Sequence, residues 1–132
     1  MTAPVIERLR KRAQFLAVRN GVRAARSTLL VEAKRRSESG PIGLGLTATK
    51  KLGGAVVRNR ARRRLREAAR QLLPKHGLPG VDYVLVARQA APDAPWAALL
   101  DDLQNALIRL AAALESGKSQ PQARAPKRPS RK

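Results

Sequence analysis

The sequence predicts a single α+β domain, in which three helices pack against a mixed sheet of about four strands. Short aliphatic runs typical of strands alternate with longer segments that have helical periodicity. The chain has 132 residues, of which 43 % are hydrophobic, so it can build one compact core. We expect this domain to span residues 1–115 and a separate tail to follow it over residues 116–132.

The first element is expected to be a short basic helix over Glu7–Arg19, because no helix-breaking residue interrupts this segment before Gly21. Phe15, the only phenylalanine of the chain, falls within it. An isolated phenylalanine is usually part of a hydrophobic core, and this is the simplest interpretation of Phe15.

Two aliphatic segments, Thr28–Ala33 and Ile42–Ala48, have the composition of strands, and the polar linker between them predicts a hairpin. Gly43 and Gly45 in the second segment lack the full spacing of a nucleotide-binding loop, so close packing against the strand backbone explains them better. Val81–Arg88 is the most convincing strand. Because a helix separates the second strand from the third, these two are expected to be parallel.

The segment from Lys50 to Arg70 is the most unusual part of the chain, because seven arginines and a single acid, Glu67, lie between Arg58 and Arg70. On a helix its arginines cover one side and its aliphatic residues share the other, and Pro74 is expected to end the helix. A merely solvated face usually mixes charges, so this face predicts a polyanionic ligand. The aliphatic side consists of Val57, Ala61, Leu65, Ala68 and Leu72.

The whole composition points to the same class of ligand. Lys and Arg total 28 against 9 Asp and Glu, which gives a net charge of +19 and favours nucleic acid as the partner. The absence of cysteine excludes disulfides and thiolate metal sites. No segment is long and apolar enough for a membrane span, and the N-terminus lacks the apolar region of a secretory signal, so we expect a cytoplasmic protein without membrane contact.

The last helix is predicted over Pro92–Ser116, where leucines recur at steps of three and four residues. Asp93 is a candidate cap, and Trp96 is expected to join the core where the helix begins. Ser116–Lys132 has three prolines, six cations and no apolar run, so it is expected to be a disordered basic tail. Nonspecific affinity for phosphates and mere solubility are both open as its role.

No residues form a recognisable catalytic constellation. His76 is the only histidine, and no partner is indicated by its spacing. Asp101 and Asp102 are adjacent and therefore point about 100° apart on a helix, which rules out a paired-carboxylate site. The sequence thus predicts no catalytic residue and no metal site in the protein.

The stretch KKLGGAVVRNRARRRLRE, which begins at Lys50, resembles the RNR signature of the bacterial ribonuclease P protein subunits. The match is specific because Arg58-Asn59-Arg60 is followed by Arg63 and by Arg66-Glu67. The resemblance extends roughly from Arg8 to Leu114. It implies the order αβββαβα with an unusual left-handed βαβ crossover, as in a ribosomal-protein-like fold, whereas the general rule favours the right-handed form.

The resemblance also implies a function. Subunits of this family assist a catalytic RNA that cleaves the 5′ leader from precursor tRNA, so the expected activity is that of an endoribonuclease whose chemistry the RNA performs. The implied partners are this catalytic RNA and precursor tRNA. The implied cofactor is Mg²⁺, held by the RNA and the substrate, and the protein is expected to be monomeric apart from RNA.

The resemblance implies two overlapping sets of contact residues. The RNA-binding set consists of Lys50, Lys51, Arg58, Asn59, Arg60, Arg62, Arg63, Arg64, Arg66 and Arg70. The leader-binding set consists of Phe15, Arg19, Leu30, Arg58, Asn59 and Arg66.

Three alternatives stay open. Phe15 either belongs to the core or stacks on an unpaired leader base, and it can do both. Arg19 and Glu32 occupy positions where the family often has aromatic residues, which favours electrostatic contact at Arg19 and leaves a cleft role of Glu32 open. A basic ribosomal or nucleoid-type protein without a processing role is the alternative function, and a membrane-active cationic protein fits the sequence poorly.

Overall fold

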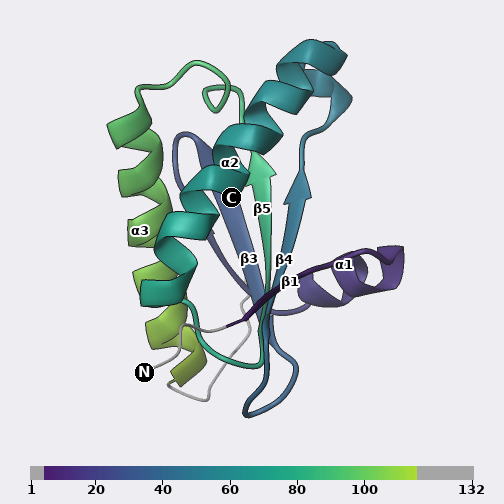
Figure 1. Cartoon of the computed structure of the whole chain (residues 1–132), viewed down its shortest axis with the longest axis vertical. Coiled ribbons are helices and arrows are strands. Elements are labelled where there is room, and N and C mark those ends of the chain that lie inside the picture. Colours follow the sequence, from purple (N-terminus) through teal and green to yellow (C-terminus); the bar gives the residue numbers. More distant parts are fainter. Residues whose placement is uncertain (1–4, 116–132) are drawn as a thin grey trace, which may run out of the picture.

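A five-stranded sheet in the order β1-β4-β5-β3-β2 forms the centre of the computed structural model, which describes residues 5–115 (Figure 1). Three α-helices and one turn of 3-10 helix, η1, complete the fold. The strands are β1 (Ile6–Arg8), β2 (Val22–Ala25), β3 (Leu29–Arg35), β4 (Ile42–Thr47) and β5 (Val81–Ala87). The helices are α1 (Arg12–Val18), η1 (Lys50–Leu52), α2 (Ala55–His76) and α3 (Trp96–Glu115).

The sheet is mixed, as predicted. β4 is parallel to both β1 and β5, whereas β3 is antiparallel to β5 and β2 is antiparallel to β3. α2 connects the parallel neighbours β4 and β5. With α2 in front of the sheet and both arrows pointing upward, β5 lies to the left of β4, so this crossover is left-handed (Figure 1).

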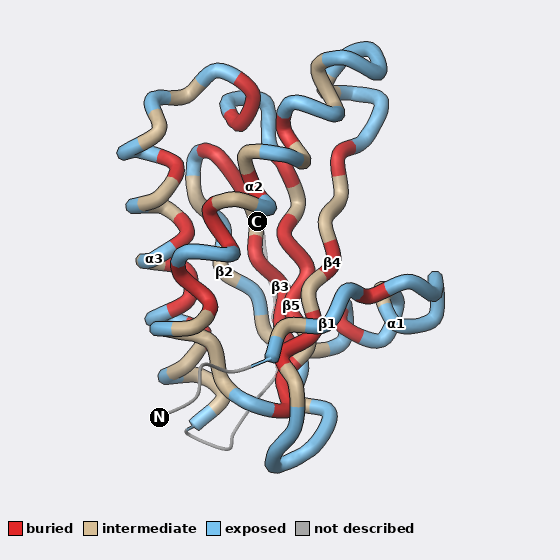
Figure 2. Tube along the Cα trace, in the orientation of Figure 1, coloured by how far each residue is buried: buried red, intermediate tan, exposed pale blue. Residues whose placement is uncertain are grey.

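The main core lies between the sheet and the pair of helices α2 and α3. Alternate residues of β3 and β5 face these helices, among them the fully buried Val31, Tyr83 and Leu85. Figure 2 shows the buried positions concentrated in these two strands and on the facing sides of α2 and α3. The predicted aliphatic side of α2 is confirmed: its members are buried apart from Val57, which is partly exposed.

A smaller core lies on the opposite face of the sheet, beneath α1. Phe15 packs there with Leu9, Val18 and Val84. A Cβ atom added to Gly45 would lie 2.5 Å from the Phe15 ring, which is far inside van der Waals contact. This approach confirms that the glycines of β4 serve close packing in a strand.

The N-terminal prediction is wrong in part, because a helix does not run over Glu7–Arg19. The chain first forms β1, and α1 begins only at Arg12. The free edge of β4 explains the difference: Ile42 N–H donates to Val5 O, and Leu9 N–H donates to Leu44 O. These backbone hydrogen bonds hold the segment extended.

The predicted hairpin is also wrong, since β5 lies between β3 and β4 and pairs with both. β5 has the most aliphatic strand sequence, and both of its faces are covered, so it takes the central place. β3 pairs instead with β2, a strand that the sequence analysis did not predict.

Pro74 does not end α2 but lies in its last turn, and the helix ends at His76. The helix can continue this far because Gly77 N–H still donates to Leu73 O at 2.7 Å. No helix in the described range 5–115 combines the length and the apolar character that crossing a membrane requires. The predicted tail at residues 116–132 lies outside the described residues.

Candidate nucleic-acid interface

The outward face of α2 carries most of the predicted RNA-binding residues. Arg63 and Arg66 are exposed, and neither side chain makes a hydrogen bond or ion pair with any residue in the described part of the chain. Arg62 is partly exposed and donates from Nη1 to Asn59 Oδ1 at 3.0 Å. These three guanidinium groups are therefore directed toward solvent and available to an anion.

Two other predicted arginines of α2 form ion pairs within the protein. Arg60 Nη1 lies 2.7 Å from Asp93 Oδ1, and Arg70 Nη2 lies 2.8 Å from Glu67 Oε2. Both pairs are at the surface, where an exposed ion pair contributes little to stability and can be exchanged for a phosphate.

Arg64 has a different environment from the rest of this face. Its Nη1 donates to Ala91 O at 2.6 Å, its Nη2 donates to Ala94 O, and its guanidinium carbon lies 5.7 Å from the centroid of the Trp96 ring. The side chain thus fastens the loop before α3 to α2. These contacts give Arg64 a structural role in the fold, and its contact with RNA stays a prediction.

The N-terminal end of α2 adds four predicted residues. Lys50 and Lys51 are exposed on η1, and Asn59 is exposed in the second turn of α2. Arg58 is half-buried, and its Nε atom is buried without a hydrogen-bond partner among the described residues. Lys50, Lys51 and Asn59 therefore extend the basic helix face toward the start of α2.

An aliphatic strip crosses the sheet on the face away from α2 and α3. The strand registers place Ala25, Leu30, Val86 and Thr47 side by side in one row across four strands. α1 covers the preceding row, so Val84 in that row is only 2 % exposed, whereas Leu30, Val86 and Thr47 remain partly open. The strip offers a surface beside α1 that is apolar apart from the Thr47 hydroxyl.

Phe15 and Arg19, both in the predicted leader-binding set, border this strip. Phe15 is half-buried and packs in the same cluster as Val86, which pairs with Leu30. Arg19 follows the last residue of α1 and is exposed. The structure therefore brings Phe15, Arg19 and Leu30 to one face of the sheet.

Glu32 lies beneath α1 and not in the open strip. It is 6 % exposed, and its Oε2 lies 3.5 Å from Arg23 Nη2. Burial raises the pKa of the Glu32 carboxyl, while the positive charges of Arg23 and Arg19 act against this shift. The carboxylate therefore faces arginines, and a leader on the strip would not meet it directly.

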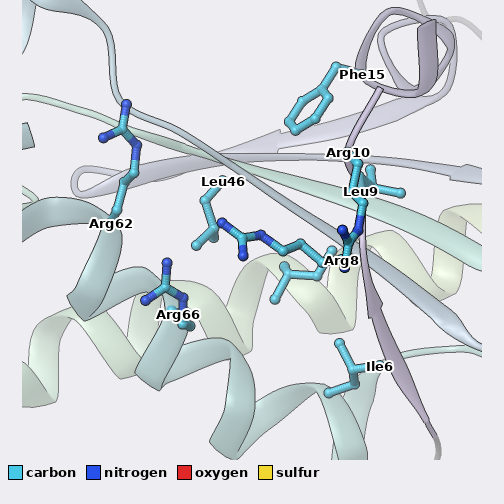
Figure 3. Close-up of a pocket in the computed structure, with 9 residues that line it drawn as sticks. Ile6, Arg8, Leu9, Arg10, Phe15, Leu46, Arg62 and Arg66 are labelled. Carbon is cyan, nitrogen blue, oxygen red and sulfur yellow. The ribbon is translucent and has the colours of Figure 1, made fainter. Parts of the chain in front are cut away.

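A groove of about 640 Å³ separates the N-terminal segment from α2 (Figure 3). Phe15 and Arg66 both line it, so the structure joins two members of the leader-binding set across the edge of the sheet. Arg58 and Asn59 do not line it. The full lining consists of Ile6, Arg8, Leu9, Arg10, Phe15, Leu44, Leu46, Arg62 and Arg66.

Arg8 and Arg10 are groove residues that the sequence analysis did not single out. Their spacing, with Leu9 between them, is the alternation typical of an extended segment and was a usable signal. Within residues 5–115, no three His, Asp or Glu side chains gather as a metal site requires.

The α+β fold, the arginine face of α2 and the aromatic ring beside an aliphatic strip define a small basic protein of the polyanion-binding class. The chain belongs to the ribonuclease P family, whose sequence model matches residues 4–111. Its role is that of the protein component of this family.

Individual relatives agree with this membership. The ribonuclease P protein component of Caulobacter vibrioides is 50 % identical over 112 residues, which cover 84 % of this chain and 75 % of the relative. That of Ruegeria pomeroyi is 48 % identical over 105 residues, or 77 % of this chain and 84 % of the relative. A solved structure of a Staphylococcus aureus RNase P protein mutant, described as defective in mRNA degradation activity, aligns with a TM-score of 0.67 at 30 % identity and covers 80 % of this chain and 87 % of its own.

Proposed function

We propose that this protein is the protein subunit of a cytoplasmic ribonuclease P, which binds the catalytic RNA and the 5′ leader of precursor tRNA. In this role it promotes the endonucleolytic removal of the leader, which gives tRNA its mature 5′ end. The observation that carries the proposal is that Phe15 and Arg66 line one groove. A surface for unpaired bases therefore adjoins a surface for RNA phosphates.

The outward face of α2 binds the structured RNA in this proposal. Arg62, Arg63 and Arg66 are the best candidates, because their guanidinium groups are not engaged by acids or backbone carbonyls of the described chain. A-form RNA presents phosphates and 2′-hydroxyls more than readable base edges. Arginine suits these ligands, since its planar fork can donate two parallel hydrogen bonds to one phosphate.

The leader lies along the aliphatic strip of the sheet. An unpaired base that stacks on Phe15 gains about 1–3 kcal/mol, and Leu30 and Val86 provide apolar contact for neighbouring bases. Arg19, at the end of α1, then meets the phosphate chain. Such contacts tolerate any base, as a subunit that serves many precursor tRNAs requires.

The bond-breaking chemistry belongs to the RNA and its Mg²⁺ ions. The protein, a monomer apart from RNA, contributes binding and geometry. Its cations reduce the repulsion between two RNA molecules, and its leader contacts hold the scissile phosphate in place. Both effects matter most when Mg²⁺ is scarce, because fewer metal ions then screen the RNA charges.

The proposal is tested by 5′ maturation of a precursor tRNA with a bacterial ribonuclease P RNA at low Mg²⁺ and near-physiological salt. Adding the full-length protein should strongly stimulate cleavage at the mature 5′ end. If the protein binds RNA but leaves the cleavage rate unchanged, the alternative of a basic ribosomal or nucleoid-type binding protein replaces the proposal.

A further inference from the structure

The groove between β1 and α2 has an apolar floor and four arginines at its rim. Ile6, Leu9, Leu44 and Leu46 line its floor, together with the ring of Phe15. Its volume of about 640 Å³ is in the range of pockets that hold a small ligand. Figure 3 shows the Arg8 side chain extending from β1 across the groove toward Arg66. The shape therefore suits a compact ligand with an apolar body and a negative group.

The charge of the groove is wholly positive. Arg8 and Arg10 come from the N-terminal segment, Arg62 and Arg66 come from α2, and no acidic residue lines the groove. The side chains of Arg8, Arg10 and Arg66 make no hydrogen bond or ion pair within residues 5–115, and the Arg62 side chain is bonded only to the neutral Asn59 amide. Four guanidinium groups that converge without an acid leave a site for phosphate.

The edge of β4 supplies polar groups at the floor. Ile42 N–H and Leu44 O form hydrogen bonds with the N-terminal segment, so the even-numbered residues of β4 face this side. β1 pairs with β4 only as far as Leu44. Since alternate residues of a strand face the same edge, the backbone N–H and C=O of Leu46 point into the groove, where no described residue pairs with them.

We propose that this groove binds one unpaired nucleotide of an RNA, with its phosphate on the four arginines and its base at the edge of β4. Each base has a donor next to an acceptor on its hydrogen-bonding edge, and the N–H and C=O of Leu46 match such a pair. The Phe15 ring contacts the side of the base. This pocket lies at the sheet edge, apart from the aliphatic strip, and the inference rests on the proposed RNA-binding function.

The test is an NMR titration of the full-length, isotope-labelled protein with AMP, UMP, ribose 5-phosphate and inorganic phosphate. AMP and UMP should shift the Leu46 amide signal saturably, whereas the two probes without a base should shift arginine Nε signals and leave Leu46 unchanged. The double variant Arg8→Ala/Arg10→Ala should weaken AMP binding about tenfold or more. The control Arg12→Ala/Arg109→Ala removes equal charge from exposed positions outside the groove and should change the affinity less than about twofold.

Equal Leu46 shifts with inorganic phosphate would overturn the inference and leave a simple anion site. AMP shifts confined to Leu30 and Val86, or no shifts at all, would also overturn it. The proposed function is judged separately by stimulation of tRNA maturation. Stimulation without nucleotide binding in the groove would reject only the pocket, and nucleotide binding without stimulation would reject only the subunit role.

Discussion

Glu32 is the only charged side chain buried in the described part of the chain, and its position has a consequence for stability. Burial raises the pKa of its carboxyl above the ordinary 4.5, despite the nearby Arg23 and Arg19. The folded protein therefore binds this proton more tightly than the unfolded chain does. The resulting contribution to stability is fully present below pH 4.5 and is lost as the pH rises through the folded pKa.

We therefore expect Glu32→Gln, which removes the charge, to raise the melting temperature at neutral pH relative to the native protein. The difference should shrink as the pH falls and Glu32 becomes protonated. Glu67→Gln is the control of opposite sign, because its hydrogen bonds with Arg70 lower the pKa of Glu67. Thermal scans across pH measure both. A lower melting temperature for Glu32→Gln at neutral pH would mean that attraction by Arg23 outweighs burial.

Arg64 is expected to act through stability and not through RNA contact. Arg64→Ala removes two hydrogen bonds to the loop carbonyls of Ala91 and Ala94, and the stacking on Trp96. The free energy of unfolding should fall by about 2 kcal/mol, measured by urea denaturation. Arg63→Ala, at an exposed neighbouring position, should leave it nearly unchanged. Equal stabilities for the two variants would show that Arg64 does not fasten this loop.

At the scale of elements, α2 carries the proposed RNA-binding arginines on its exposed side and core residues on its buried side. Arg62→Ala/Arg66→Ala should weaken RNA binding. The slope of log affinity against log salt concentration should also become shallower by about 1.4–1.8, because two phosphate contacts are lost. The melting temperature should stay the same, because both side chains lie off the buried side. Filter binding across a salt series and thermal scans measure these quantities.

The matched control on the buried side is Leu65→Ala, since Leu65 is fully buried. This variant should lose roughly 2–5 kcal/mol of stability. Where it remains folded, its RNA affinity should be close to that of the native protein. A large drop in melting temperature for the double arginine variant would show that those arginines are structural.

The elements differ in how far the sequence could predict them. α2, β5 and α3 follow from local patterns, because each is long and buries a regular face. β1 and β2 are short edge strands that form because a neighbouring strand has unpaired backbone N–H and C=O groups. No local sequence pattern indicates where such groups are free. The same reason explains the wrong hairpin: local linker chemistry favoured it, but the most aliphatic strand, β5, occupies the centre.

The candidate site was predictable to a similar degree. The arginine face of α2 follows from helical periodicity and was located correctly on the exposed side. The structural use of Arg64 depends on the loop before α3, which lies far along the sequence. Likewise, Arg8 and Arg10 become groove residues only because β1 pairs with β4 and faces α2.

At the scale of the whole molecule, the net charge of +19 affects folding as well as binding. Like charges on one small domain repel one another, and a bound anion relieves this repulsion. Inorganic phosphate should therefore raise the melting temperature more than sodium chloride at equal ionic strength, because it also binds the folded state. Equal effects of the two salts would indicate screening alone, without a phosphate site.

In the proposed function, the protein holds the leader of precursor tRNA beside Phe15 while α2 binds RNA. The most direct test compares substrates with short and long leaders, cleaved by the complex of this protein and a bacterial ribonuclease P RNA. We predict that the protein increases affinity for the long-leader substrate much more than for the short one, and that Phe15→Ala removes most of this difference. Equal effects on both substrates would show that the protein does not hold the leader.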